Sequence, residues 1–210
     1  MTAMGISRRR AGGARRAAVL EAVGDVLADR GYENTRFADV SAASGVAIST
    51  LQNYFGSRAD MVIEAMAVFT DREVAAQAEV AAAEADPWRR LVTLVDRSLD
   101  NSVRTRRILV EFWRSAMRDP DLRGYGQEVS ARYREPFLAA VRDGVQRGEF
   151  APVHDAEVVT SLLLSTLSGL IVWRAQHDPT PAPTEFRDVL LAQLGLMLGV
   201  HRTTERIEER

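Results

Sequence analysis

One stretch of the sequence, residues 31–58, constrains the chain more than any other. Two short helical patterns flank Gly45, which can supply the left-handed backbone that a tight turn between helices needs. In the second pattern, Leu51 and Phe55 point toward a core while small polar side chains face outward. Two helices joined in this way are the format in which a protein places a helix in the major groove of DNA. The stretch therefore predicts a helix-turn-helix head.

Helical periodicity continues through nearly all the remaining sequence, so we expect an all-α fold of about nine helices. Thr35 and Ser57 are predicted to cap the helices that follow them. Pro136 should kink or split the helix that contains it. Proline and glycine mark the other ends. The expected helices are 15–30, 36–44, 48–54, 57–84, 87–102, 104–118, 121–148, 155–177 and 184–200.

The sequence also predicts a domain organisation. Residues 1–14 should form a flexible basic arm, followed by the DNA-binding head over 15–58. A helical ligand-binding and dimerisation domain should cover 59–201, and residues 202–210 should be a frayed tail. Arg9, Arg10 and Arg15 lie directly before the head, where they favour contacts with DNA phosphates or the minor groove over a merely solvated tail.

Several functional classes find no support in the composition. The chain has no cysteine, and His154, His177 and His201 lack metal-ligand spacing, so we expect no metal and no cofactor. Asp96 and Glu111 are lone acids without a partner for catalysis, and there is no glycine-rich phosphate loop, which argues against an enzyme. The longest apolar run, residues 158–173, is short and rich in Ser and Thr, so a cytoplasmic protein without a membrane span is expected.

The head resembles that of the TetR family of bacterial repressors. The similarity rests on Ala18-Val19-Leu20, Gly31-Tyr32, Thr35, Asp39-Val40, Ala43, Gly45-Val46, Thr50-Leu51, Tyr54-Phe55 and Ser57-Arg58. Residues 108–123, Tyr133, the Gly148-Glu149-Phe150 segment and residues 168–173 are similar to the ligand domain of the family's choline-responsive branch.

The resemblance implies roles for individual residues in DNA binding. Thr35 and Arg36 should lie near a phosphate, and Tyr54 should touch the DNA backbone. Arg58, in the place of the family's usual lysine, should contact another phosphate. On the outward face, Ser49, Thr50, Gln52 and Asn53 should read base edges. Two departures stand out, because the family usually has tyrosine at Gln52 and often a serine cap at Ala47. Glutamine can read adenine, so the base preference should be unusual.

Aromatic and sulfur-containing side chains in the second domain are candidates for an effector pocket. Trp113 and Tyr133 are the strongest, because they lie on neighbouring predicted helices and their ring faces could hold a cation. An apolar effector fits them as well, and for each residue core packing is the alternative. The full set is Phe69, Trp88, Phe112, Trp113, Met117, Tyr133, Phe137 and Trp173.

The last two helices carry apolar stripes that are broader than one face needs. Such a pair usually covers both its own core and a partner, which predicts a homodimer, although closure of a monomeric core is the alternative. The predicted dimer residues are Leu163, Leu167, Leu170, Ile171, Leu190, Leu194 and Met197.

The sequence therefore predicts a homodimeric repressor that binds a palindromic DNA operator and leaves it when a small-molecule effector binds. The alternative is a dimeric DNA-binding protein without a small-molecule ligand, acting architecturally or under the control of a protein partner.

Overall fold

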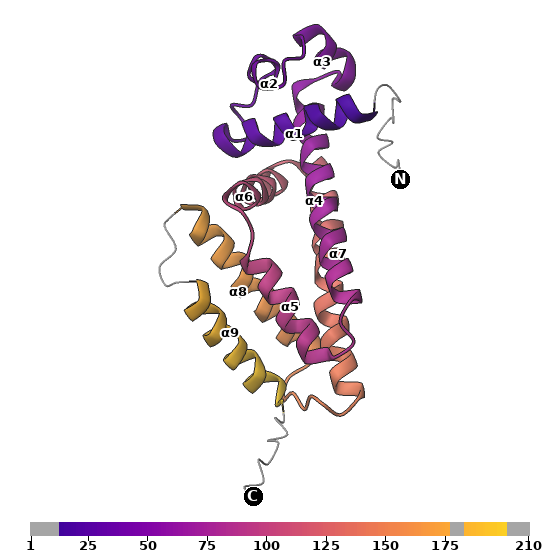
Figure 1. The fold of residues 1–210 in the computed structure, drawn as a ribbon, viewed down its shortest axis with the longest axis vertical. Coiled ribbons are helices and arrows are strands. Elements are labelled where there is room, and N and C mark those ends of the chain that lie inside the picture. The colour runs from indigo at the N-terminus through magenta and orange to yellow at the C-terminus, as the bar shows by residue number, and fades with distance from the viewer. Residues whose placement is uncertain (1–12, 177–182, 201–210) are drawn as a thin grey trace, which may run out of the picture. The chain divides into compact units, whose positions relative to one another are not determined.

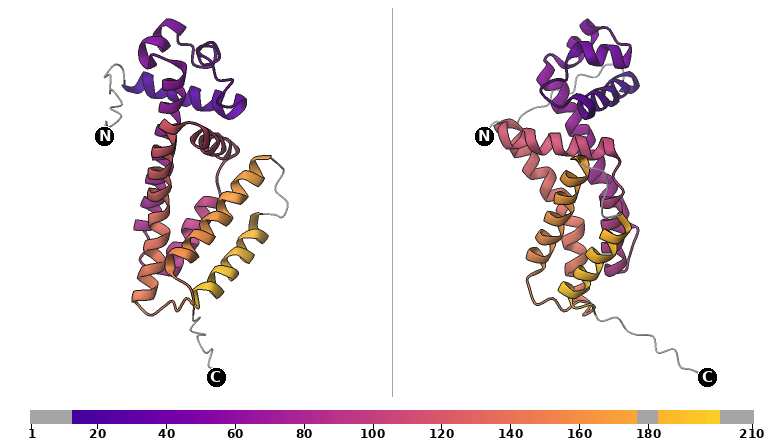
Figure 2. Two further views of the ribbon diagram at one scale, coloured as in Figure 1. Left: turned by 180° about the vertical axis from the view of Figure 1, so that it is seen from behind. Right: turned by 90° about the vertical axis from the view of Figure 1, so that its left-hand side faces the viewer.

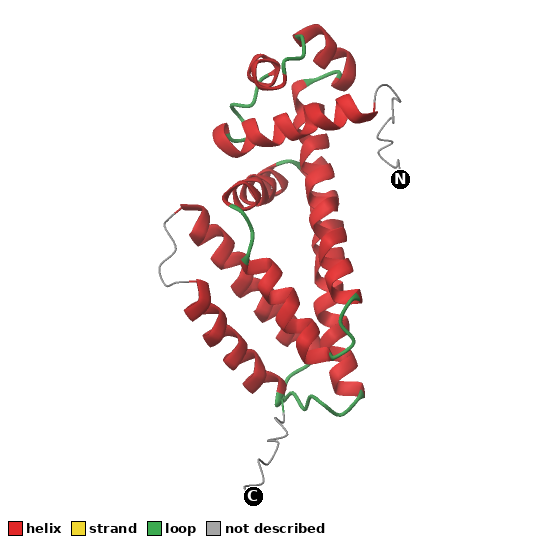
Figure 3. Ribbon diagram, viewed as in Figure 1, coloured by secondary structure: helices red, strands yellow, loops and turns green. Residues whose placement is uncertain are grey.

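The computed structural model describes residues 13–176 and 183–200. Nine α-helices and no strand occupy these residues (Figures 1 and 3), which confirms the all-α prediction. The helices are α1 (Gly13–Arg30), α2 (Phe37–Ser44), α3 (Ile48–Phe55), α4 (Arg58–Ala82), α5 (Pro87–Leu99), α6 (Val103–Arg118), α7 (Pro120–Gln146), α8 (Ala156–Gln176) and α9 (Pro183–Leu198). Arg9, Arg10 and the predicted frayed tail lie outside the described residues. Helix α7 continues through Pro136 as one element, so the predicted split is wrong.

The chain forms two compact units that differ from the predicted division at residue 58. Unit 1 comprises Met1–Arg72 and Val103–Gly126, and unit 2 comprises Glu73–Ser102 and Gln127–Arg210. Helices α4 and α7 each contribute residues to both units, whereas α6 belongs wholly to the unit that contains the helix-turn-helix. The helix-turn-helix and α6 therefore belong to one compact unit.

Two sets of polar contacts explain why α6 belongs to unit 1. Near its start, Arg104 forms an ion pair with Asp25 of α1 at 2.5 Å and with Glu21 at 3.1 Å. Farther along α6, a carboxylate oxygen of Glu111 accepts a hydrogen bond of 2.8 Å from the backbone N–H of Tyr32. Beneath these contacts Ile108 is fully buried. Because the partners are about eighty residues apart in the chain, periodicity gave no sign of them.

The helix ends within the head follow their local sequence. Ser57 caps α4 as predicted, since its Oγ accepts a hydrogen bond of 3.1 Å from the N–H of Asp60. Gly45 has φ of 67°, the left-handed conformation that the turn between α2 and α3 requires. The predicted cap of α2 is wrong. The cap is Arg36, whose N–H donates to the Asp39 carboxylate at 3.2 Å, while the Thr35 hydroxyl donates to the Gly31 carbonyl at 2.8 Å.

Unit 2 is built around α5, whose Leu91, Leu94 and Val95 are fully buried. Residues of α7, α8 and α9 pack against this helix, among them Phe137, Leu163 and Leu194. Helices α8 and α9 lie side by side, and the view from behind shows α8 in front of α5 (Figure 2). The α8–α9 pair therefore has one side against the core and another side that residues 13–176 and 183–200 leave uncovered.

Candidate nucleic-acid interface and effector cleft

Helix α3 separates its polar and apolar faces as the sequence predicted. Leu51 and Phe55 are buried in the head, while Ser49, Gln52 and Asn53 are exposed and Thr50 is half-buried. Ala47 offers no side-chain cap, yet α3 begins at Ile48 as expected. Exposed hydroxyl and amide groups on one helix face can form hydrogen bonds with base edges in the major groove. The face is thus chemically suited to reading DNA.

Contacts from α1 and α4 fix the far end of α3. The guanidinium group of Arg16 pairs with the Glu64 carboxylate, with Nη2 2.5 Å from Oε2. It also lies over the Phe55 ring, 4.9 Å from the centroid, and donates a 3.5 Å hydrogen bond to the Tyr54 carbonyl. Tyr54 itself is half-buried, edge-on to Phe55. Arg16 directly follows Arg15, which the sequence assigns to DNA, whereas the structure makes Arg16 a brace for α3.

Arg58, which was predicted to contact a phosphate, has its guanidinium group on the segment that precedes α2. Its Nη1 donates hydrogen bonds to the carbonyls of Tyr32 at 2.6 Å and Thr35 at 3.3 Å, and its guanidinium lies 4.9 Å from the centre of the Tyr32 ring. Thr35 is fully buried, so its side chain cannot reach a phosphate, and we remove it from the predicted DNA contacts. Arg15 and Arg36 are exposed, as phosphate contacts must be.

We expect the substitution Arg58→Gln to lower the free energy of unfolding by about 1–3 kcal/mol, because hydrogen bonds to charged groups contribute on that scale. Arg30→Gln is the matched control, since Arg30 pairs with Asp39 at 2.6 Å but half of its side chain is exposed. An exposed pair contributes at most about 1 kcal/mol. Urea unfolding monitored by circular dichroism compares the two variants. Equal losses would show that Arg58 is not a brace.

The structure corrects the predicted dimer residues. Leu163, Leu167, Ile171, Leu190 and Leu194 are all 7% exposed or less and pack inside unit 2. Leu170 and Met197 are partly buried against the same core. A second chain cannot reach side chains that the first chain already covers. The five buried residues hold α8 and α9 onto unit 2 and are wrong as dimer contacts, whereas the assignments of Leu170 and Met197 stay predictions.

The uncovered side of α8 carries an apolar row that we call the α8 seam. Its members are spaced alternately four and three residues apart, as on one face of a helix, and all are exposed or nearly so: Val158, Leu162, Ser165, Gly169 and Val172. On α9, Val189 and Leu196 are 63% and 75% exposed.

The segment Ala156–Ala175 is long and apolar enough to cross a membrane, with mean hydropathy 1.6, contrary to the expectation from the sequence. Core helices of soluble proteins share this property. Only 28% of that segment's apolar window is buried.

The predicted effector residues do not form one group. Phe69 and Phe112 are buried in unit 1 and Phe137 in unit 2, while Met117 and Trp173 are 71% and 54% exposed. Of the favoured pair, Trp113 belongs to unit 1 and Tyr133 to unit 2. Burial raises the pKa of Tyr133, whose hydroxyl is 2.8 Å from Ser98 Oγ. The positions of Phe69, Phe112 and Phe137 fit core packing, the alternative for this set, whereas Met117 and Trp173 lie on the surface.

Trp88 is the exception, because it lines a cleft of about 1220 Å³ in unit 2. The start of α5, the segment around Phe150 and one face of α9 form its walls. The Trp88 ring reaches Gly195 of α9, where an added Cβ would lie 3.5 Å away. Three acidic and two basic residues stand around the cleft: Asp86, Glu149, Asp188, Arg89 and Arg187.

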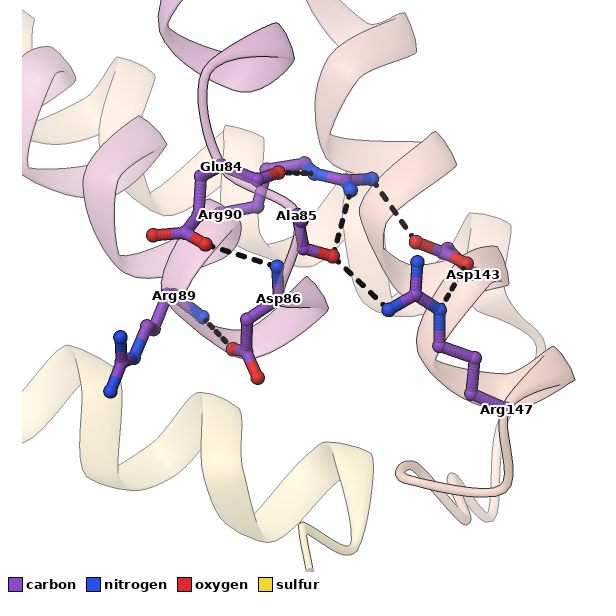
Figure 4. Close-up of polar contacts among 7 residues, drawn as sticks. All are labelled: Glu84, Ala85, Asp86, Arg89, Arg90, Asp143 and Arg147. Atoms are coloured by element: carbon purple, nitrogen blue, oxygen red, sulfur yellow. Dashed lines mark hydrogen bonds and ion pairs between the residues drawn. The ribbon is translucent and has the colours of Figure 1, made fainter.

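Polar contacts hold one rim of this cleft in place (Figure 4). Arg90 donates to the Glu84 carbonyl at 2.8 Å and pairs with Asp143 of α7 at 3.3 Å. Arg147 joins the same carboxylate at 2.8 Å and donates to the Ala85 carbonyl at 3.1 Å. These contacts tie the turn between α4 and α5 to α7. They thereby fix the position of the first turn of α5, which carries Trp88.

Comparisons with known proteins agree with the helix-turn-helix geometry. Residues 19–65 match the family model of bacterial regulatory proteins of the tetR family, and residues 87–199 match that of BetI-type transcriptional repressors, C-terminal. The HTH-type transcriptional repressor KstR2 of Mycobacterium tuberculosis is 24% identical over 86% of this chain and 92% of its own length.

Two solved structures share the fold. A putative transcriptional regulator from Saccharomonospora viridis in complex with choline has a TM-score of 0.74 at 24% identity, over 85% of this chain and 94% of its own. The transcriptional regulator FadR from Bacillus subtilis in complex with stearoyl-CoA has a TM-score of 0.73 at 17% identity, over 88% and 99%.

Proposed function

Because the chain belongs to the TetR family of bacterial regulatory proteins, we propose that it is a homodimeric repressor that releases its operator when an effector binds. The observation that carries the proposal is the exposed polar face of α3 on a head braced by Arg16 and Arg58. Arg15, Arg36 and Tyr54 would contact phosphates and set the register, while Ser49, Thr50, Gln52 and Asn53 would read bases.

The α8 seam supports the homodimer. A row of exposed apolar side chains on a helix of mean hydropathy 1.6 is costly in water and is stabilised when a second surface covers it. A second copy presents the same seam, so a twofold interface is self-complementary. Ser165 and Gly169 leave room at its centre for the partner helix to approach closely. Two heads related by this symmetry would read the two halves of a palindrome.

The cleft at Trp88 is the proposed effector site, and a cation is the effector class that its chemistry favours. An indole face holds a quaternary ammonium group by cation–π attraction, and carboxylates outnumber guanidinium groups around the cleft. The choline complex of the Saccharomonospora regulator supports this class. The stearoyl-CoA complex of FadR represents the apolar alternative. Release of DNA would require the effector to favour the DNA-free state by several kcal/mol.

Titration with choline should change the tryptophan fluorescence of the wild type, and the change should disappear in Trp88→Phe. Trp173→Phe is the control, because Trp173 lies outside the cleft and is 54% exposed. Stearoyl-CoA serves as the second probe. A fluorescence response to stearoyl-CoA but not to choline would mean that the effector is an acyl compound and not a cation. Equal choline responses in wild type and Trp88→Phe, or no response to either probe, would reject this site.

A genome-fragment selection with the purified protein tests the repressor function. We expect the protein to retain a small set of fragments in salt that removes bulk DNA. Sequence-independent retention that vanishes with modest salt would mean that the head binds phosphates without reading bases, and would favour the alternative of an architectural protein.

A further inference from the structure

Ile48 is the first residue of α3, and 42% of it is exposed although it is a large apolar residue. The buried residues of α3 are Leu51 and Phe55. The exposed Ala47 lies next to it, so the leading end of α3 is apolar while Gln52 and Asn53 farther along are polar. Single exposed apolar side chains are common on protein surfaces, but this one lies on the helix proposed to enter the major groove, where DNA would cover it.

The position of Ile48 relative to Gln52 is fixed by the helix. Residues four apart are neighbours on one face, with Cβ atoms about 5–6 Å apart. Successive bases along a strand are separated by about 3.4 Å. When Gln52 reads one base pair, Ile48 therefore lies over a base pair one or two steps away.

The major groove offers one apolar group to such a side chain, the 5-methyl group of thymine. Resting on the proposed function, we infer that Ile48 determines specificity by packing against a thymine methyl in each half-site. Gln52 and Ile48 then form a two-part reader, one part selecting by hydrogen bonds and the other by apolar contact. A polar side chain at position 48 would lack this preference.

Deoxyuridine tests the inference, because it pairs as thymidine does and lacks only the methyl group. In a fragment taken from the genome selection, each thymine is replaced in turn, in both half-sites together. We expect one position where the replacement weakens wild-type binding about tenfold, since covering one methyl-sized group is worth roughly fourfold in each half-site. In Ile48→Ala the same replacement should change the affinity less than twofold.

Two further variants make the result specific to Ile48. Ile48→Val keeps a branched methyl and should retain most of the thymine preference. Val68→Ala removes another exposed apolar side chain, on α4 and with 37% exposure, leaves Ile48 intact and should retain all of it. Wild-type binding that is indifferent to deoxyuridine at every position would overturn the inference, as would an undiminished preference in Ile48→Ala. If the wild type fails to discriminate between unmodified fragments, the proposed function falls as well, so the two failures are distinguishable.

Discussion

Replacing both Gln52 and Asn53 with alanine should lower affinity for the selected operator by about a thousandfold or more, to the level of unrelated DNA. A well-placed amide contact to a base contributes about 1–3 kcal/mol, and a symmetric dimer makes each contact twice. The affinity of a DNA-binding protein for its specific site exceeds its affinity for non-specific DNA by about 10³-fold at least. Loss of base reading should remove this difference in affinity. The fold should survive, because both side chains are exposed.

The measurement compares operator and unrelated DNA in parallel titrations at several salt concentrations. Arg36→Gln is the matched control, because Arg36 is also an exposed residue of the head but is assigned to a phosphate and not to a base. It should weaken both DNAs alike and reduce the salt dependence, without changing their ratio. If the double alanine variant keeps the operator preference of the wild type, α3 does not read the sequence through these two residues.

Gly169→Arg should convert the dimer to a monomer and lower operator affinity by about 10²–10⁴-fold, the range that linkage of two binding modules provides. Within one chain the substitution is harmless, because an added Cβ at Gly169 meets no atom within 4 Å. At the centre of the α8 seam, however, a long charged side chain would occupy the space of the partner helix.

Gly124→Arg controls for the chemistry of this change. Gly124 also lies in a helix with open space around an added Cβ, but it belongs to α7 and to unit 1, whereas the α8 seam belongs to unit 2. Sedimentation equilibrium should give the monomer mass for Gly169→Arg and the dimer mass for Gly124→Arg. A dimer in the Gly169 variant with wild-type operator affinity would contradict the proposed interface.

Much of the fold could be predicted because helix periodicity and helix ends are local properties. Gly45 and Ser57 act as the sequence indicates. The dimer surface was misassigned because the apolar stripe of α8 is two residues wide. Val158 and Val159 are adjacent, yet the first is 60% exposed and the second 2%. Periodicity finds such a stripe but cannot tell which of its edges the chain covers.

Contacts between distant segments explain the remaining differences. The extent of unit 1 depends on Arg104 and Glu111, whose partners lie on α1 and in the segment after it. Trp88 was predicted together with seven other candidates, and nothing in the sequence separates it from them. Only the approach of α9 and the 148–150 segment to α5 makes its surroundings a cleft.

Protection mapping of the selected operator tests the central claim most directly. A symmetric dimer with α3 in the major groove should protect two half-sites of inverted sequence, with their centres about 34–36 Å or a multiple apart. The stoichiometry of the complex should be two chains per operator. Protection of a single half-site, of an asymmetric tract, or of the whole fragment without phasing would contradict a symmetric dimeric reader.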